Sequence, residues 1–381
     1  MLKIINKYTL ILILLVPINA LLGQSKNLNF IFKSGEEGYA CFRIPAIVST
    51  KSGVLLAFAE GRKTGCGDAG DIDLVLKRSL DFGKTWSSLQ MVWSDSTNTC
   101  GNPAPVVDQN TGDIVLLSTW NLGTDHEWQI IDQKSKDTRR IFVLRSSNEG
   151  DSWSTPKEIT EQVKLPGWTW YATGPGNGIQ LQSSVHKNRL VIPCDHIEAQ
   201  TKKYFSHIIF SDDAGATWQL GGTTPTDQVN ECAVVELNNG ELLLNMRNYN
   251  KQRVRQTSTS KDGGASWLAF IPDTVLIEPV CQASLIAYPA FGKKAIAFSN
   301  PANTKSRTNM TVRISTDAGK TWKKQALLYD GPSAYSNLVA LANKKLACLY
   351  EAGGASAYEG IVYEVVMKCQ FKRDQTKHTY F

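Results

Sequence analysis

Arg43 is the one charged residue in a strand-like, mostly apolar stretch at residues 39–48 (YACFRIPAIV). Burying a guanidinium group is costly unless an anion meets it. The planar group suits carboxylates and phosphates, which it binds through two parallel hydrogen bonds. The anion is either a carboxylate of the protein itself, which is the more common case for an arginine in a strand, or the acidic group of a ligand. The other elements of the chain determine which of these two anions Arg43 contacts.

Five segments share the pattern Ser-x-Asp-x-Gly-x-Thr-Trp, with small departures such as Asn148 in place of the aspartate. Each has side chains that can bond nearby backbone amides, a glycine that supplies a positive φ and a tryptophan that can pack beneath the turn, which is typical of a tight hairpin. A calcium site would need more carboxylates than each segment holds. These segments, here called Asp boxes, are residues 79–86, 146–153, 211–218, 260–267 and 315–322.

The spacing of the Asp boxes predicts the fold. The boxes begin 67, 65, 49 and 55 residues apart, and strand-like runs such as residues 72–76 and 311–314 precede them. A period of this length holds about four strands, as in a β-propeller blade. Five such blades and one without a box use the chain from residue 24 onward. We therefore expect an all-β, six-bladed β-propeller as a single catalytic domain at residues 24–381, closed by a strand near residues 28–32 against one near 361–366.

The N-terminus predicts export. Lys3 and Lys7 precede a short apolar run, which is typical of a secretory signal peptide at residues 1–23 and is too short for a membrane-spanning helix. Without these two lysines the formal charge falls from +6 to +4. The basic residues are too scattered to predict a nucleic-acid-binding face, and the charged loop at residues 134–140 is expected to be solvated. A mildly positive field favours small anionic substrates.

All eight cysteines follow the predicted signal peptide. None belongs to a Cys-x-x-Cys pair, so the sequence does not predict a zinc site. An even number of cysteines in an exported chain permits disulfides, but their pairing does not follow from the sequence.

The motif FRIP at residues 42–45, followed by the Asp boxes, resembles the exo-α-sialidases (neuraminidases) of the bacterial and animal type. The resemblance extends from about residue 38 to residue 366. It implies a six-bladed propeller that acts on sialylated glycoconjugates with no cofactor and no metal. Asp boxes alone also occur in other secreted propellers, so the residues below carry the functional part of the resemblance.

Sialidases bind the carboxylate of sialic acid with three arginines, which the resemblance assigns to Arg43, Arg247 and Arg307. Glu351 matches the family residue that holds the first arginine. Two arginines at positions 253 and 255 compete with Arg247 on charge alone, but their spacing fits the family poorly. Three guanidinium groups offer more donors than one carboxylate can accept, so some of them must be held by protein carboxylates.

The resemblance assigns the nucleophile to Tyr335 and its base to Glu231. Most retaining glycosidases attack with a carboxylate, and sialidases with a tyrosine are an exception. The anomeric carbon of sialic acid bears its own carboxylate, which would repel an anionic attacker. A phenol approaches as a neutral group, provided that a neighbouring base accepts its proton.

Asp68, on a glycine-rich loop at residues 65–71, matches the family acid that protonates the departing glycosidic oxygen. For this role its pKa must be raised at the moment of proton transfer. Asp71 and Asp73 are its rivals. Asp73 falls in the alternating run toward the first Asp box and is expected in a strand, and Asp71 does not fit the family spacing.

Five further residues are expected around the sugar. Arg62 matches a family arginine near the 4-hydroxyl, which many relatives pair with an aspartate where this chain has Asn102. Asn102 keeps the hydrogen bonding but loses the charge. Trp120, Trp128 and Tyr171 are expected on loops near the mouth, where they could line an N-acetyl pocket, although aromatic residues also serve as plain core.

The sequence thus predicts a secreted or periplasmic, monomeric, retaining exo-α-sialidase that releases terminal sialic acid from glycoproteins, glycolipids and oligosaccharides through a tyrosyl-enzyme intermediate. Three alternatives stay open. The same site could transfer sialic acid to another sugar or within the molecule. A sialic acid-binding propeller without catalysis would not need Asp68, Glu231 and Tyr335, which are all present. A propeller acting on an unrelated polysaccharide would not need three matched arginines.

Overall fold

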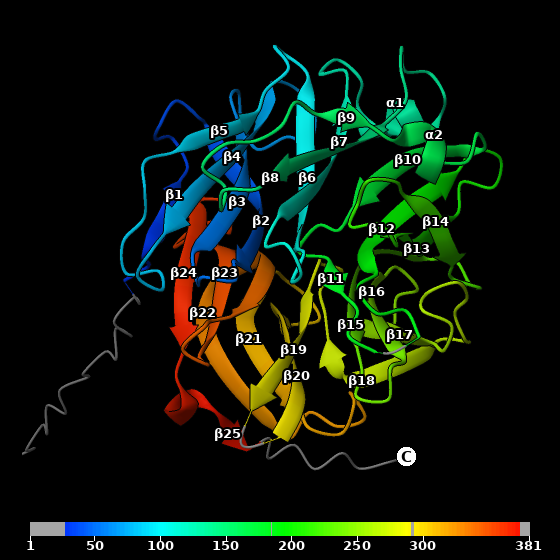
Figure 1. The fold of residues 1–381 in the computed structure, drawn as a ribbon. Coiled ribbons are helices and arrows are strands. Elements are labelled where there is room, and N and C mark those ends of the chain that lie inside the picture. The colour runs from blue at the N-terminus through cyan, green and yellow to red at the C-terminus, as the bar shows by residue number, and fades with distance from the viewer. Residues whose placement is uncertain (1–26, 184, 291–292, 374–381) are drawn as a thin grey trace, which may run out of the picture.

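The strands of this chain are arranged around a central axis (Figure 1). The computed structural model describes residues 27–183, 185–290 and 293–373, so the expected signal peptide lies outside the described residues. Within these ranges, no helix has the length and apolar character needed to cross a membrane.

The described strands pair into four sheets. When the two eight-stranded sheets are divided between β4 and β6 and within β22, the strands form six antiparallel ladders, which we treat as blades, and the first strand of each lies nearest the axis. The first blade comprises β2 (Cys41–Ser49), β3 (Leu55–Arg62), β4 (Ile72–Ser79) and β5 (Gln90–Trp93). The second comprises β6 (Thr99–Val107), β7 (Ile114–Asn121), β8 (Arg140–Ser146) and β9 (Lys157–Glu158). The third comprises β10 (Trp168–Thr173), β11 (Ile179–Gln180), β12 (Leu190–Glu198), β13 (Tyr204–Ser211) and β14 (Gln219–Thr223). The fourth blade comprises β15 (Val229–Glu236), β16 (Leu242–Asn248), β17 (Val254–Ser260) and β18 (Ile271–Ile277). The fifth comprises β19 (Ser284–Ala290), β20 (Lys293–Pro301), β21 (Thr308–Ser315) and the first part of β22 (Lys324–Ala340). The sixth comprises the second part of β22, β23 (Leu346–Ala352), β24 (Gly360–Val366) and β1 (Phe30–Lys33). The predicted all-β propeller is confirmed.

The ring closes as predicted, between the two ends of the described chain. β1 pairs antiparallel with β24, so that the sixth blade contains strands from both ends of the sequence. The long strand β22 connects this blade to the fifth, because its first part pairs with β21 and its second part with β23. A last short strand, β25 (Lys372–Arg373), adds to the edge of β22.

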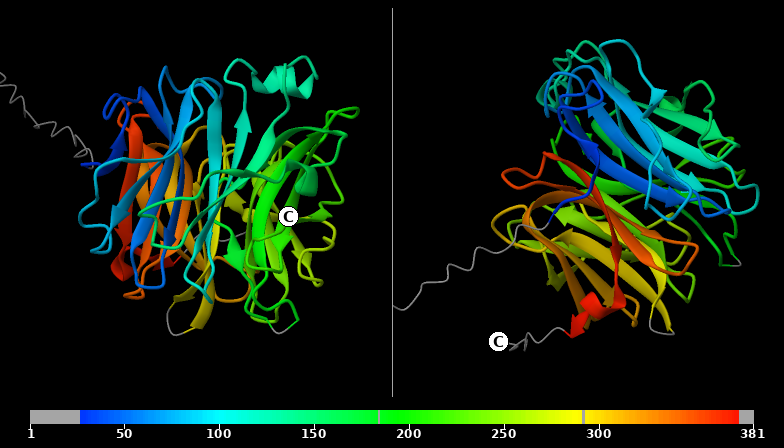
Figure 2. Two further views of the ribbon diagram at one scale, coloured as in Figure 1. Left: turned by 45° about the horizontal axis from the view of Figure 1, so that its top comes forward. Right: turned by 90° about the vertical axis from the view of Figure 1, so that its left-hand side faces the viewer.

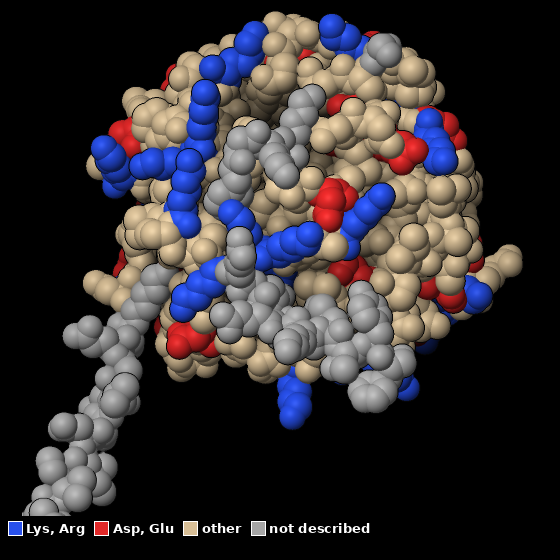
Figure 3. Space-filling view, turned by 90° about the horizontal axis from the view of Figure 1, so that it is seen from below, with Lys and Arg blue, Asp and Glu red and all other residues tan. Residues whose placement is uncertain are grey.

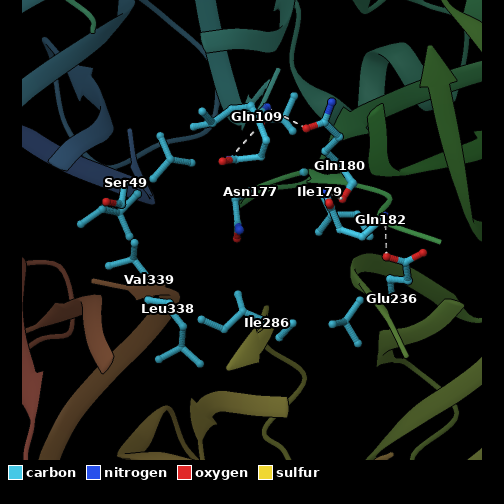
Figure 4. Close-up of a pocket in the computed structure, with 18 residues that line it drawn as sticks. Ser49, Gln109, Asn177, Ile179, Gln180, Gln182, Glu236, Ile286, Leu338 and Val339 are labelled. Carbon is cyan, nitrogen blue, oxygen red and sulfur yellow. Dashed lines mark hydrogen bonds between the residues drawn. The ribbon is translucent and has the colours of Figure 1, made fainter. Parts of the chain in front are cut away.

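The inner strands of all six blades surround a central cavity of about 290 Å³ (Figure 4). Arg43 lies near the start of β2, whereas Ser49, which lines the cavity, lies at its end. The cavity and the predicted site therefore lie toward opposite ends of the propeller axis. The cavity wall includes Ser49, Val107, Gln180, Glu236, Ile286 and Val339, one from each blade.

The Asp boxes form structural turns between the last two strands of each of the first five blades. In the first box, the Ser79 hydroxyl accepts the Gly83 N–H at 2.8 Å, and the Asp81 carboxylate accepts the Thr85 N–H at 2.9 Å and the Thr85 hydroxyl at 2.7 Å. Gly83 has a φ of 86°, and a Cβ there would lie 2.1 Å from the Tyr363 ring. Only glycine satisfies both conditions.

The box carboxylates make folding stability depend on pH. Hydrogen bonds from Thr85 lower the pKa of Asp81 to about 2. Slight burial raises the pKa of Asp213, but hydrogen bonds from Thr217 and Ser211 lower it to about 2. An unfolded aspartate titrates near 3.9. Because these pKa values are lowered by folding, the stabilisation is fully present above about pH 4 and is lost as the pH falls toward about 2.

We expect Asp213→Asn to fold and to lose less stability than the wild type on acidification from about pH 4 to about pH 2. The second box already shows that asparagine supports the turn, because the Asn148 side chain accepts the Ser152 N–H at 3.0 Å and donates to the Ser152 hydroxyl at 2.8 Å. Thermal midpoints measured across this pH range check the prediction. An unchanged pH dependence would contradict it.

Among the described residues, helical structure is limited to short connecting segments: α1 (Glu127–Ile131), α2 (Thr160–Val163) and the 3₁₀ turn η1 (Lys368–Gln370). α1 lies on a loop that projects beyond the ends of the strands (Figure 2).

On the face shown in Figure 3, groups of basic side chains lie beside acidic ones.

Candidate active site

Irregularities in the inner strands place the predicted site residues. A β-bulge adds a residue to one strand and redirects the side chains at that point, and bulges are common next to active sites. Four inner strands shift register where a predicted residue occurs: β2 between Arg43 and Ala46, β6 around Asn102, β15 around Glu231 and β22 around Tyr335.

The bulge at Arg43 has a strained backbone. Ile44 has a φ of 58°, which is rare for a β-branched residue. Its N–H donates to the Glu351 carboxylate at 3.0 Å. Pro45 lacks an N–H, which an inner strand tolerates because one of its edges faces the axis and not another strand. Tertiary contacts to Glu351 thus hold a conformation that the local sequence disfavours.

Glu351 connects the first arginine to the predicted nucleophile. Its carboxylate is fully buried and accepts hydrogen bonds from Arg43 Nε at 3.1 Å and Nη2 at 3.5 Å. It also accepts the backbone N–H of Tyr335 at 3.1 Å. One buried carboxylate therefore holds both the Arg43 guanidinium and the strand that carries Tyr335. Glu351 is thus a protein anion that compensates the charge of Arg43.

Tyr335, Glu231 and Arg247 form one hydrogen-bonded cluster. The Tyr335 hydroxyl donates to Glu231 Oε1, and Arg247 Nη1 donates to Glu231 Oε2 at 2.5 Å and to the Tyr335 oxygen at 3.1 Å. Burial, followed by the nearby Glu231 charge, raises the pKa of Tyr335 well above its usual range. The phenol therefore stays protonated at neutral pH, with a carboxylate in place to accept its proton.

The three predicted arginines converge on Tyr335. The guanidinium carbons of Arg43 and Arg307 lie 5.1 and 5.6 Å from the centre of the Tyr335 ring. Arg307 Nη1 donates to the Tyr358 hydroxyl at 2.9 Å, and its Nη2 donates to the Val280 carbonyl at 3.3 Å. These are neutral partners, so Arg307 keeps its positive charge available for an anion beside the phenol.

Asp68 is the loop aspartate that meets the site arginines. Its Oδ1 lies 3.2 Å from Arg43 Nη1 and 2.8 Å from Arg62 Nη1, and its side chain is 60% exposed. Partial desolvation raises the pKa of Asp68, but the Arg62 and Arg43 charges outweigh this and lower it overall. In the empty site this group is an ion-paired carboxylate.

The rivals of the predicted residues have structural roles. Asp73 is buried and accepts the Tyr39 hydroxyl at 2.8 Å. Arg255 is fully buried against Glu278 at 2.8 Å and also donates to Asn245. Both side chains are buried, and protein groups hold their charges.

Asn102 is held by an arginine that sequence reasoning missed. The Asn102 side-chain oxygen accepts hydrogen bonds from Arg139 Nη2 and from the Thr119 hydroxyl. Arg139 is only 2% exposed, and its guanidinium lies 4.0 Å from the Trp170 ring centre. The expectation that the whole loop at residues 134–140 is solvated is therefore wrong at this position. Adjacent residues at a strand entry face opposite sides, so one of a pair such as Arg139 and Arg140 should point inward.

The three predicted mouth aromatics lie in different environments. The Trp120 indole donates to Asp95 at 2.7 Å and is partly buried. Trp128, on α1, is 59% exposed. Tyr171 has no exposed surface and packs against Trp168 and His207, so it belongs to the core of the third blade and cannot touch a ligand in this conformation.

Two carboxyl groups near the site were not anticipated. The pKa of Glu127, on α1, is raised by desolvation and by the Asp68 and Glu231 charges, although Arg139 opposes this. Burial, then Glu231 and Glu127, raises the pKa of Asp195 well above its usual range, and its Oδ2 atom has no hydrogen-bond partner. In both cases burial and neighbouring carboxylates shift the pKa upward, toward the protonated form.

Comparison with known proteins identifies the family. A model of the BNR repeat-like domain matches residues 53–348. A sialidase of Bacteroides fragilis is 33% identical over 343 residues, covering 84% of this chain and 62% of its own length. An exo-α-sialidase of Aspergillus fumigatus is 31% identical over 358 residues, covering 86% of this chain and 84% of its own length. The chain therefore spans less than two thirds of the Bacteroides protein but most of the Aspergillus one.

Among solved structures, a Hadza microbial sialidase, Hz136, superimposes with a TM-score of 0.81 at 32% identity, covering 89% of this chain and 68% of the other. The repeat family, the sequence relatives and the solved fold all point to the same family. This chain belongs to the sialidase family.

Proposed function

We propose that this protein is a retaining exo-α-sialidase that releases terminal sialic acid from glycoproteins, glycolipids and oligosaccharides. The observation that carries the proposal is the Tyr335–Glu231–Arg247 cluster, surrounded by the guanidinium groups of Arg43 and Arg307. We further propose that the segment at residues 1–23 exports it and that it acts as a monomer.

Substrate binding begins with an exchange of anions. In the empty site Arg43 shares its donors between Glu351 and Asp68. Asp68 is the more exposed of the two carboxylates, so it is the partner that a sugar carboxylate displaces from Arg43. Arg247 and Arg307 complete the anion site. The displaced Asp68 loses part of the positive field that lowered its pKa and becomes able to carry a proton.

In the first chemical step, the Tyr335 oxygen forms a bond to the anomeric carbon while its proton passes to Glu231. The bond from the anomeric carbon to the departing oxygen breaks, and that oxygen takes the proton of Asp68. Arg247 stabilises the developing charge because it contacts both Glu231 and the phenol oxygen. Charge on the attacking oxygen never reaches that of a carboxylate, which avoids repulsion by the substrate's own acid group.

In the second step, water attacks the anomeric carbon and gives a proton to Asp68. The bond to Tyr335 breaks, and the phenol recovers its proton from Glu231. Both catalytic carboxyl groups return to their starting states, and the anomeric configuration is retained after two inversions.

Turnover of an aryl α-sialoside, followed by NMR, tests the proposal. We expect free sialic acid to appear first as the α-anomer and then to mutarotate. Initial β-anomer would exclude a retaining mechanism, and an anhydro sugar or a transfer product would show that the same site does not hydrolyse. Absence of any turnover would overturn the proposed activity.

A further inference from the structure

The loop that carries Asp68, between β3 and β4, has little backbone structure of its own. Gly65 and Gly70 have φ values of 154° and 129°, and glycine allows the chain many alternative conformations. A hydrogen bond from the Lys63 N–H to the Asp71 carbonyl, at 3.0 Å, closes the base of the loop. The tip needs other contacts to keep the Asp68 carboxyl in one place.

One such contact is covalent. Cys41 and Cys66 form a disulfide, the one found among the described cysteines. Cys66 lies two residues before Asp68, and Cys41 lies two residues before Arg43 in β2. The bond therefore ties the loop tip to the strand that carries the first arginine, and it limits how far the two charged groups can separate.

The second contact is a fork of hydrogen bonds from Arg62. Its Nη1 donates to the carbonyl oxygens of Cys66 at 2.6 Å and Gly67 at 2.8 Å, and to Asp68 Oδ1 at 2.8 Å. Arg62 is thus committed to the loop, and its predicted contact with the sugar can use only the donors left over. A buried guanidinium is stable only where an anionic partner compensates its charge.

Glu60 holds it. Glu60 Oε2 accepts Arg62 Nε at 3.0 Å and Nη2 at 2.6 Å, and both side chains are almost fully buried. Glu60 Oε1 accepts the Asn102 N–H at 2.8 Å, which anchors the bulge of the second blade. A Cβ at Gly101 would lie 2.4 Å from Glu60 Oε1, so the neighbouring blade leaves room for this carboxylate.

We propose that the Cys41–Cys66 disulfide and Glu60, acting through Arg62, are positioning elements that hold the Asp68 carboxyl beside the departing oxygen. This inference rests on the proposed function, because Asp68 is the acid of that reaction. The disulfide restrains the tip, and Glu60 fixes the guanidinium to which the tip is bonded. Loss of either one frees the acid while the nucleophile and its base stay in place.

The test uses two substrates that differ in their need for the acid. Sialyllactose requires a proton for the departing sugar oxygen, whereas sialosyl fluoride releases fluoride without one. In Cys41→Ser/Cys66→Ser and in Glu60→Gln, we expect kcat/KM for sialyllactose to fall about 10- to 100-fold, with kcat/KM for the fluoride within about threefold of wild type, because kcat/KM reports the first chemical step and not the later attack of water, in which Asp68 serves as base for both substrates. KM for sialyllactose should change little. Cys369→Ser, which removes an exposed free cysteine, is the matched control and should behave as wild type.

Reduction supplies the same test if the double variant does not fold. A thiolate of a small dithiol attacks Cys66 Sγ, and ring closure of the reagent then releases both cysteines as thiols, with both electrons coming from the reagent. The ratio of kcat/KM for sialyllactose to kcat/KM for the fluoride should fall on reduction of the wild type and recover on reoxidation. Equal losses with both substrates, or an unchanged ratio throughout, would overturn the inference. A wild type that hydrolyses neither substrate would overturn the proposed function and this inference with it.

Discussion

Tyr335→Phe is expected to lower kcat for an aryl sialoside at least about a thousandfold and to leave KM nearly unchanged. The substitution removes the oxygen that attacks the anomeric carbon and keeps the ring that lies beside Arg43 and Arg307. The ion pair between Arg247 and Glu231 does not depend on the hydroxyl, so the anion site should persist. Steady-state kinetics on the aryl sialoside, with binding of a sialic acid analogue measured separately, checks both parts.

Tyr288→Phe is the matched control, because it also removes one hydroxyl from a buried tyrosine. That hydroxyl donates to the Lys344 carbonyl at 3.1 Å, outside the arginine cluster. We expect full activity and a loss of about 0.5–1.5 kcal/mol in the free energy of unfolding. If Tyr335→Phe kept near-normal turnover, the tyrosyl mechanism would be wrong, and a carboxylate such as Glu231 would have to act as nucleophile.

Asp68→Ala is expected to lower kcat/KM for sialyllactose about 10²- to 10⁴-fold and to spare kcat/KM for sialosyl fluoride, whose first chemical step needs no proton. KM should not rise, because removal of Asp68 frees Arg43 from the carboxylate that competes with the substrate. Asp71→Ala distinguishes the rival acid on the same loop. A leaving-group-dependent loss in Asp71→Ala, with normal turnover in Asp68→Ala, would reverse the assignment.

The same ion pair sets the expected pH dependence of the wild type. An acid must be protonated to act, so turnover of sialyllactose falls as the pH rises through the pKa of Asp68. In the free enzyme Arg62 and Arg43 lower that pKa, whereas in the complex the substrate carboxylate compensates Arg43. The alkaline limb of kcat/KM, which reports the free enzyme, should therefore lie at lower pH than the limb of kcat. Coincident limbs would show that the substrate does not displace Asp68.

The fold was predictable because its signals are local. The hydrogen bonds that Ser79 and Asp81 make in the first Asp box lie within residues 79–85, so the turn can be predicted from this short segment alone. The repeat spacing then implies the number of blades, and the predicted closing strand is found in β1 against β24. Hairpin blades pair mostly with sequence neighbours, and this keeps the pattern readable.

The prediction of the site rested on resemblance to the family's motifs, and the structure corrects the predicted exposure of two side chains. Tyr171 was expected near the mouth and lies in the core, and Arg139 was expected in solvent and lies beneath Asn102. In each case the local backbone conformation determines whether the side chain points into the core or toward solvent. Bulges and positive φ values, as at Ile44, interrupt the alternation on which such predictions rely.

The amino-acid sequence by itself determined the Asp-box turns, the all-β repeat and the types of residue available for chemistry on a sugar acid. Only the tertiary structure decided which charges meet. Glu351, in the sixth blade beside Tyr335, reaches Arg43 in the first blade, and Glu231 of the fourth blade meets Tyr335. Within the first blade, the disulfide joins β2 to the loop between β3 and β4. The contacts between blades depend on closure of the ring, which brings distant segments to one end of the axis. A buried charge is stable only where such closure supplies its partner.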